Sequence, residues 1–310
     1  VEGWPQLEML RRLGCRLAQG FLFAEPVPAA DCARFLQGRP ISVADIGGAV
    51  PGGYNPNATE VWQEALRIPP IKVYEKGKLR KDVWDLIFAN IRFDIVQHDM
   101  KAEIGACTVG ERRLLSTLEK YGLESFEAHK QALFDATRKM MEAEIAEIPN
   151  GVYRGEGNIY YDGRHEGSKF VIRVTITVED RKIRFDYSDT DAQTNGFVNG
   201  TFTSSASATV LTLLQMVNPD IPHNEGMVAP IEIVIPEGTV LNASYPKATT
   251  FGNHLCPPNA EAIQRALAPV IPDRVTAGWN NLLCSLTTGI DPKKGEPYVD
   301  IGFMGLKGGS

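Results

Sequence analysis

The residues whose types and spacing can do chemistry begin with the stretch ADIGGAVPGGYN, residues 44–55. Asp45 lies just before Gly47 and Gly48, and glycines let the backbone approach a ligand closely because they have no Cβ. A carboxylate in that place can orient a metal ligand or contact a substrate. The ordinary alternative is an aspartate that hydrogen-bonds its own turn, and the residue types alone leave both interpretations open.

The glycine-rich loop from Gly47 to Asn57 is itself a candidate binding site. Consecutive backbone N–H groups can form a nest that binds an anion, which makes Gly47 and Gly48 candidate cofactor-binding residues. The loop contains neither a P-loop nor a G-x-G-x-x-G pattern, and no Lys-Ser or Lys-Thr pair follows it. A structural network of turns is the commoner role for any single glycine.

A third candidate is the H-x-C pair formed by His254 and Cys256 in GNHLCPP, residues 252–258. Such a pair can hold zinc, but a structural zinc site needs four ligands, and the sequence offers no second pair. His254 is therefore interpreted as a residue of a substrate pocket rather than as a zinc ligand. His223, in DIPHNEG, is a weaker candidate of the same kind.

The acidic residues Asp186, Asp189 and Asp191 are closely spaced in DYSDTDAQTNG, as carboxylates are in calcium-binding loops. The twelve-residue spacing of an EF-hand and its closing glutamate are absent. Polar turn chemistry after a strand is the usual explanation, so we predict no metal here.

Composition limits the classes of function. The chain has 310 residues and a formal net charge of −6, so it offers no basic field for nucleic acid or for an anionic membrane surface. It contains no apolar run long enough to span a bilayer, and its first residues lack the features of a signal peptide. Its five cysteines are odd in number, widely spaced and without a C-x-x-C pair, which predicts a reducing, cytoplasmic location.

The predicted helices and strands that must position these residues differ from one region of the chain to the next. Residues 5–18, 19–28 and 29–38 have the patterns of a helix, a short buried strand and a helix. This α–β–α order is typical of an α/β barrel or a doubly wound sheet, but about forty residues are too few to form a core.

A long helical region is predicted after a short strand, turn and return within residues 68–82. One helical pattern runs from Lys81 to Tyr121, with a break near Phe93–Gln97, and a second runs from about Ser125 to Ile148. Together they predict a long helical hairpin.

After Gly151 the period changes to that of strands. Residues 169–180 and 181–190 predict a β-hairpin, and residues 203–217 predict a helix. A strand follows within 229–242, and another helix begins near Asn259. The predicted fold class is α+β, with mixed or antiparallel sheets and a long helical hairpin, preceded by an α–β–α remnant of an α/β barrel.

The first forty residues resemble the C-terminal end of an EAL-type cyclic-di-GMP phosphodiesterase. The resemblance rests on Glu2–Gly3, on LRRLGC at 10–15 and on AQGFLFAEPVP at 18–28. It matches Glu2 with the acidic residue of the family's E-G-V-x-T motif and Gln19 with its Q-G-F/Y glutamine. EGWPQ stands where EGVET is usual, and the E-x-L signature is absent, so residues 1–40 are interpreted as an inactive remnant.

The rest of the chain, from about Val43 to the end, resembles the hydantoinase B/oxoprolinase family. Within that family it is most similar to the alpha subunit of acetone carboxylase. Ordered blocks carry this resemblance: residues 44–79, ACTVGERRLL at 106–115, FDYSDTDAQTNGFVN at 185–199, residues 218–253, and GFMGLKGG at 302–309. The two resemblances predict two domains, residues 1–40 and residues 41–310.

The second resemblance implies ATP-dependent hydrolysis of a cyclic amide or carboxylation of a ketone, such as acetone to acetoacetate. It implies a partner, a hydantoinase A-type or acetone carboxylase beta-type subunit that binds ATP, and a small gamma-type subunit as a further partner. It also implies a divalent metal, Mn²⁺, in the B-type chain. The substrate stays open among hydantoin, oxoproline, acetone and an aromatic ketone, as does the stoichiometry.

The resemblance departs from the family pattern at the metal site. Family members have H-H-A-D-I-G-G, whereas Ser42 and Val43 stand before Ala44 here, and no H-x-x-D pair lies upstream. Histidine and carboxylate ligands suit manganese, so the site is predicted to be incomplete and the chain inactive as it stands. The resemblance implies catalytic roles for Asp45 and His254, with Asp45 at most orienting a metal ligand.

Two alternatives remain. The chain can be part of an EAL signalling fusion, which an intact barrel upstream would support. It can also be a non-catalytic assembly surface, which would bind a hydantoinase A-like chain without nucleotide or metal.

Overall fold

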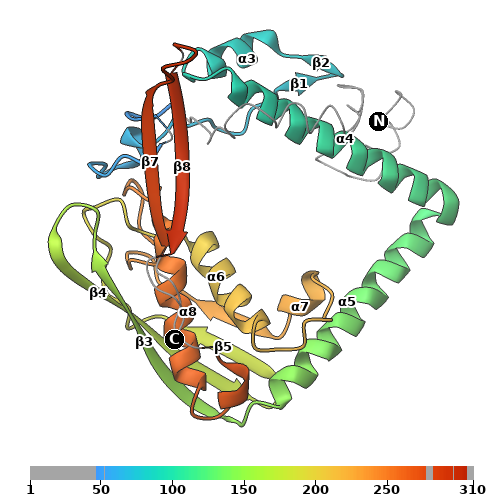
Figure 1. Ribbon diagram of the computed structural model, residues 1–310. Coiled ribbons are helices and arrows are strands. Elements are labelled where there is room, and N and C mark those ends of the chain that lie inside the picture. The colour runs from blue at the N-terminus through green and yellow to red at the C-terminus, as the bar shows by residue number, and fades with distance from the viewer. Residues whose placement is uncertain (1–46, 52, 277–281, 296, 306–310) are drawn as a thin grey trace. The chain divides into compact units, whose positions relative to one another are not determined.

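The computed structural model describes residues 47–51, 53–276, 282–295 and 297–305 (Figure 1). The described chain forms two compact units. The first contains Gly47, Leu66–Gln131 and Thr287–Asp300, and the second contains Gly48–Ala65, Ala132–Leu286 and residues 301–305. Residues 1–40, with their predicted α–β–α remnant and the predicted domain boundary after it, lie outside the described residues.

The first unit begins with a small hairpin of β1 (Tyr74–Glu75) and β2 (Lys78–Leu79), which confirms the predicted strand, turn and return. Two helices follow, α3 (Lys81–Phe88) and α4 (Ile95–Tyr121). The indole Nε1 of Trp84 donates to Gln97 Oε1 at 3.1 Å and joins the two helices. The break lies at residues 89–94, slightly earlier than predicted, and Gln97 is already in the second helix.

Helix α5 (Leu123–Ala146) follows α4 after Gly122 alone, and the boundary between the two units falls within it. The prediction of two long helices is confirmed. A packed helical hairpin usually has a reversing loop of about two to five residues, whereas one residue connects these helices. Gly122, at φ 78°, is the single residue between the two helices.

The second unit is built on a four-stranded sheet in the order β3–β4–β5–β6. Its strands are β3 (Gly151–Tyr161), β4 (Glu166–Glu179), β5 (Lys182–Asp186) and β6 (Ile231–Val234). The first three are antiparallel, and β6 runs parallel to β5. The predicted α+β class and the predicted hairpin at β4–β5 are confirmed, whereas β3 was not predicted, since its glycines and charges obscure the alternation.

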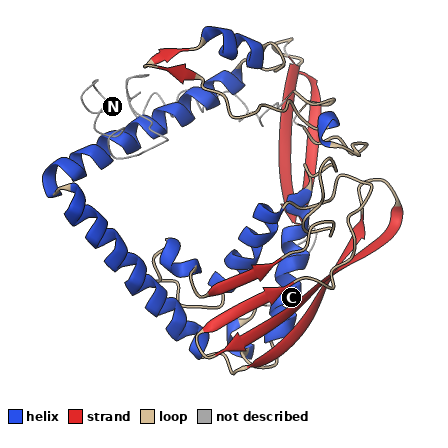
Figure 2. Ribbon diagram, turned by 180° about the vertical axis from the view of Figure 1, so that it is seen from behind, coloured by secondary structure: helices blue, strands red, loops and turns tan. Residues whose placement is uncertain are grey.

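Helices cover one face of this sheet (Figure 2). Helix α8 (Cys256–Leu267) lies against β3, and α6 (Phe202–Leu214) lies against α8. Helix α8 starts three residues earlier than predicted, because its prolines occupy the first turn, where no backbone N–H is needed. Between sheet and helices lies a core whose fully buried members include Ile176, Phe185, Ile263 and Leu267.

Short elements complete the described chain. They are η1 (Val61–Gln63), α7 (Glu225–Val228), η2 (Gly252–Leu255), η3 (Pro272–Arg274) and the two-stranded sheet of β7 (Leu282–Ile290) and β8 (Pro297–Gly305). Among the described residues, no helix has the length and apolar character needed to cross a membrane.

Candidate functional site

Four segments of the second unit meet near the start of α8. They are the segment Gly48–Ala65, the loop 194–200, the segment 246–255 and the β3–β4 turn at 162–165. Figure 1 shows the first of these, in blue, beside the orange chain that leads into α8. All four are loops or single turns, which is where binding and catalytic residues concentrate on a rigid scaffold.

The two ends of the glycine-rich segment pack against each other. A Cβ at Gly48 would lie 1.9 Å from the carbonyl oxygen of Glu64, so only glycine fits there. Gln63 Oε1 accepts from the backbone N–H of Thr59 at 2.7 Å and caps η1. Gly47 belongs to the first unit, where a Cβ would lie 2.8 Å from Asn90 O. The structure thus gives both glycines packing roles, and their role in cofactor binding stays a prediction.

Glu64 attaches this segment to the chain before η2. The residue is 4% exposed, and its two carboxylate oxygens accept from the backbone N–H groups of Thr249 at 2.9 Å and Thr250 at 2.7 Å. A carboxylate that accepts two backbone hydrogen bonds fixes both partners strongly. Sequence analysis missed Glu64, because its partner Thr249 lies 185 residues away.

An aromatic cluster centres on Phe251. Its ring stacks on Phe197 with centroids 5.2 Å apart and on His254 with centroids 5.1 Å apart, and Tyr54 of the glycine-rich segment meets it edge-on at 5.7 Å. The structure therefore places the predicted residue His254 in the same cluster as the segment that carries Gly48.

Asn199 holds the loops beneath this cluster. The residue is fully buried, and its Nδ2 donates to Gly196 O at 2.9 Å and to Ala248 O at 3.0 Å, while its Oδ1 accepts from Thr194 N at 2.7 Å. One side chain thus satisfies backbone groups of two loops. Buried amides that are fully bonded in this way rigidify their surroundings.

A carboxylate–imidazole pair lies in the β3–β4 turn. Asp162, 4% exposed, accepts through Oδ2 from His165 Nδ1 at 2.8 Å, and through Oδ1 from the backbone N–H groups of Arg164 at 2.8 Å and His165 at 2.7 Å. Burial alone would raise the pKa of Asp162, but these hydrogen bonds outweigh it and hold the pKa below the ordinary value. A D-x-x-H spacing after a strand was the signal that sequence analysis did not use.

The turn packs directly on the aromatic cluster. A Cβ at Gly163 would lie 2.1 Å from Phe197 Cδ1, and a Cβ at Gly196 would lie 1.8 Å from Asp162 O. The Phe197 ring therefore touches the turn on one side and stacks on Phe251 on the other. His165 and His254 both belong to elements that pack on this pair of rings.

Two of the predicted residues cannot be compared with the cluster. Asp45 and Ser42 lie outside the described residues, so the roles assigned to them stay predictions. In the part of the chain that the structure describes, no three histidine, cysteine, aspartate or glutamate side chains come together to hold a metal. The described residues therefore do not fit the Mn²⁺ that the family resemblance implies.

The acidic stretch after β5 has structural partners. Asp191 pairs with Arg173 at 2.6 Å and accepts from Val171 N at 2.8 Å, and Asp186 pairs with Arg184 at 3.0 Å. These contacts agree with the predicted turn role for the stretch. His223, the weaker histidine candidate, is exposed in a loop of the second unit.

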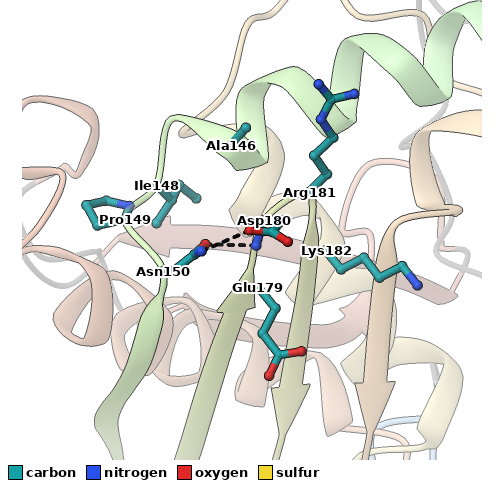
Figure 3. Close-up of a pocket in the computed structure, with 8 residues that line it drawn as sticks. All are labelled: Ala146, Ile148, Pro149, Asn150, Glu179, Asp180, Arg181 and Lys182. Carbon is teal, nitrogen blue, oxygen red and sulfur yellow. Dashed lines mark hydrogen bonds between the residues drawn. The ribbon is translucent and has the colours of Figure 1, made fainter.

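A shallow surface hollow lies at the other end of β4 (Figure 3). Asn150 and Asp180 bond across it, with Asn150 Nδ2 donating to Asp180 Oδ1 at 3.1 Å and Asp180 N donating to Asn150 Oδ1 at 2.8 Å. These bonds tie the end of α5 to the β4–β5 turn. Since β4 has 14 residues, its two ends are about 45 Å apart, and the hollow lies at the opposite end of the strand from the β3–β4 turn.

Comparison with known proteins shows which proteins this chain is similar to. The sequence profile of the hydantoinase B/oxoprolinase family matches residues 19–310. The beta chain of the caprolactamase from Pseudomonas jessenii is 34% identical over 268 residues, which are 83% of this chain and 45% of that protein. The B-type chain of a putative D-/L-hydantoinase from Pseudomonas sp. (strain NS671) is 33% identical over 269 residues, again 83% of this chain and 45% of that protein.

Two solved structures share the fold. The crystal structure of the ATP-dependent caprolactamase from Pseudomonas jessenii superposes with a TM-score of 0.74 at 32% identity, covering 83% of this chain and 44% of that one. A nucleotide-free structure of acetone carboxylase gives a TM-score of 0.73 at 19% identity, covering 84% and 37% of the two chains. The chain spans about half the length of the curated relatives it matches.

Proposed function

The chain belongs to the hydantoinase B/oxoprolinase family, and from this premise we propose that it is part of the B-type component of an ATP-dependent enzyme that opens a cyclic amide. The observation that carries the proposal is identity above 30%, over 83% of the chain, to components of a caprolactamase and of a putative hydantoinase. The names of both relatives refer to ring amides.

Ring-amide opening is favoured over ketone carboxylation. The likeness to acetone carboxylase is 19% identity and concerns the fold, whereas the ATP-dependent caprolactamase has 32% identity with a similar TM-score. Carboxylation of acetone stays as the second candidate reaction.

ATP is part of this proposal because the caprolactamase with the similar fold is an ATP-dependent enzyme. The sequence has no P-loop, so a hydantoinase A-type partner is proposed to bind ATP and activate the ring, with a small gamma-type subunit as a further partner. The caprolactamase and hydantoinase relatives are both named as single subunits of their enzymes, which supports a partnered enzyme. A cytoplasmic location is proposed from the cysteine pattern.

The described residues offer binding and proton transfer rather than metal chemistry. Glu64 and Asn199 hold the loops that carry the aromatic cluster and His254. We assign no step to Mn²⁺, since the described residues do not form a site for it. The sequence predicted an inactive chain for another reason, the incomplete metal site at Ser42. The present proposal is that the chain is inactive alone because it lacks the activating partner.

The test is reconstitution with an A-type subunit from the same source. The full chain and its partner are incubated with ATP and, in turn, caprolactam, hydantoin, 5-oxoproline, or acetone with bicarbonate, and products are measured by mass spectrometry. We expect ATP-dependent opening of at least one ring amide and no product without the partner. Acetoacetate as the only product would replace the ring-amide proposal with carboxylation.

A further inference from the structure

The Asp162–His165 pair has features that a turn alone does not require. Oδ1 of Asp162 is sufficient to bond the two backbone N–H groups that shape the turn. Its Oδ2 goes to the imidazole instead, at 2.8 Å. The imidazole gains a fixed direction from a carboxylate that is itself buried, while 64% of the His165 side chain stays exposed.

The proton in this pair can be placed by chemistry. An ionised carboxylate only accepts hydrogen bonds, and the lowered pKa of Asp162 keeps it ionised at neutral pH. His165 Nδ1 must therefore carry the proton and donate it to Asp162. In the neutral ring this leaves the lone pair on Nε2, which is the arrangement of a histidine prepared to accept a proton.

The pair is also held rigidly in place. Tyr161 Oη donates to Gly163 O at 2.8 Å, and Ser168 Oγ donates to His165 O at 2.7 Å. The turn lies against Phe197, which stacks on Phe251. A general base needs such fixed geometry, because small displacements reduce the rate of proton transfer strongly.

Asp162 and Arg164 are the charged residues of the turn itself, and Tyr161 precedes it. The loop 194–200 that packs against the turn, TNGFVNG, carries no charged side chain. The buried carboxylate of Asp162 is the group that contacts the imidazole directly, so it sets the direction of the ring.

We propose that His165 transfers the proton in the ring-opening reaction and that Asp162 is its positioning residue. The inference rests on the proposed function and assigns it a residue. Nε2 of His165 takes a proton from water as the water oxygen bonds to the amide carbon. The C–N bond then breaks, and the imidazolium returns the proton to the leaving nitrogen, so the ring takes up one water and gives a carboxylic acid and an amine, which ionise to a carboxylate and an ammonium group. The ATP proposed to activate the ring takes up a second water and leaves as ADP and inorganic phosphate.

The first test measures the pair without turnover. Long-range ¹H–¹⁵N NMR spectra of the full chain labelled at histidine report which ring nitrogen carries the proton. We expect His165 to show a single tautomer protonated at Nδ1, and Asp162→Asn to change that tautomer balance. An averaged pattern for wild-type His165, like that of an exposed histidine, would overturn the proposal.

The second test uses the reconstituted enzyme and the ring amide that it opens. We expect His165→Gln to lower kcat by about 10²–10⁴-fold with little change in KM, the usual contribution of a proton-transfer residue. Asp162→Asn should lower kcat less and alter the acidic limb of the pH profile. His129→Gln is the matched control, because His129 is an exposed histidine on α5 whose Nδ1 bonds Ser125 O at 2.7 Å.

The outcomes separate the two proposals. Wild-type enzyme that opens no ring amide contradicts the proposed function. Wild-type enzyme that is active, with His165→Gln within threefold of its kcat, contradicts the role of His165 and leaves the proposed function standing. An equal loss in His165→Gln and His129→Gln would show a general effect of histidine replacement and would also count against the proposal.

Discussion

At the scale of single residues, the site depends on side chains that bond backbone groups far away in sequence. Glu64 accepts from Thr249 and Thr250, and Asn199 bonds Ala248 across 49 positions. Neither Glu64 nor Asn199 belongs to a chemical motif, so nothing in the local sequence singles it out. His254 is indicated by the Gly–Asn turn before it, whereas the D-x-x-H spacing of Asp162 and His165 gains meaning only when the structure shows that the two side chains bond.

Glu64 provides the prediction at this scale. Glu64→Ala leaves two part-buried backbone N–H groups without their acceptor. The free energy of unfolding falls by about 1–3 kcal/mol for each of these groups that does not gain a hydrogen bond to water. We expect faster amide hydrogen exchange at Thr249, at Thr250 and throughout residues 48–65. Exchange followed by mass spectrometry measures this directly.

The control for that change is Glu237→Ala, since Glu237 is an exposed glutamate of the same unit. Exchange in residues 48–65 should be the same in this variant as in the wild type. If Glu64→Ala also leaves the exchange unchanged, the carboxylate does not hold the segment in solution.

At the scale of elements, the close contact of β3 with α8 depends on two glycines. A Cβ at Gly155 would lie 2.0 Å from Ala262 O, and one at Gly157 would lie 1.8 Å from Pro258 O. Glycine normally weakens a strand, so the sequence did not indicate a strand here. The structure supplies the reason for these residues, because the backbones of strand and helix nearly touch.

Gly157→Ala is the prediction for this contact. The added methyl group forces α8 away from β3, and overpacking of this kind costs about 1–3 kcal/mol. The expected result is a lower midpoint of chemical denaturation, followed by circular dichroism.

Gly105→Ala serves as the comparison, because nothing lies within 4 Å of a Cβ at this position in α4. Alanine there should leave the chain unchanged or more stable by about 0.5–1 kcal/mol. A Gly157→Ala variant as stable as Gly105→Ala would mean that the close contact does not form in solution.

At the scale of the whole molecule, the chain is two compact units that correspond to about half of longer relatives. The glycine-rich stretch is divided between them, with Gly47 in the first unit and Gly48 in the second. The sequence marked this stretch as a junction between two family regions, which is a different division from that into the two compact units. The predicted boundary at residue 40 stays a prediction, and the family match extends back to residue 19.

Metal content is the prediction that belongs to this scale. Ser42 stands where the family resemblance implies histidine, and a hydroxyl is a poor ligand for Mn²⁺ at neutral pH. We expect the purified chain to hold far less than one equivalent of manganese after incubation with Mn²⁺ and removal of the unbound ion, measured by plasma mass spectrometry. A stoichiometric ion that is lost in Asp45→Asn would show that the site is complete.

The sequence by itself determined the family, the α+β class, the two long helices and the β4–β5 hairpin, because these depend on ordered motifs and on local periodicity. It also indicated His254. Tertiary structure alone decided that β3 is a strand, that Glu64 holds the glycine-rich segment, and that Asp162 and His165 belong to a turn against Phe197. Those features depend on contacts between distant segments, and such contacts leave no period or spacing in a single sequence.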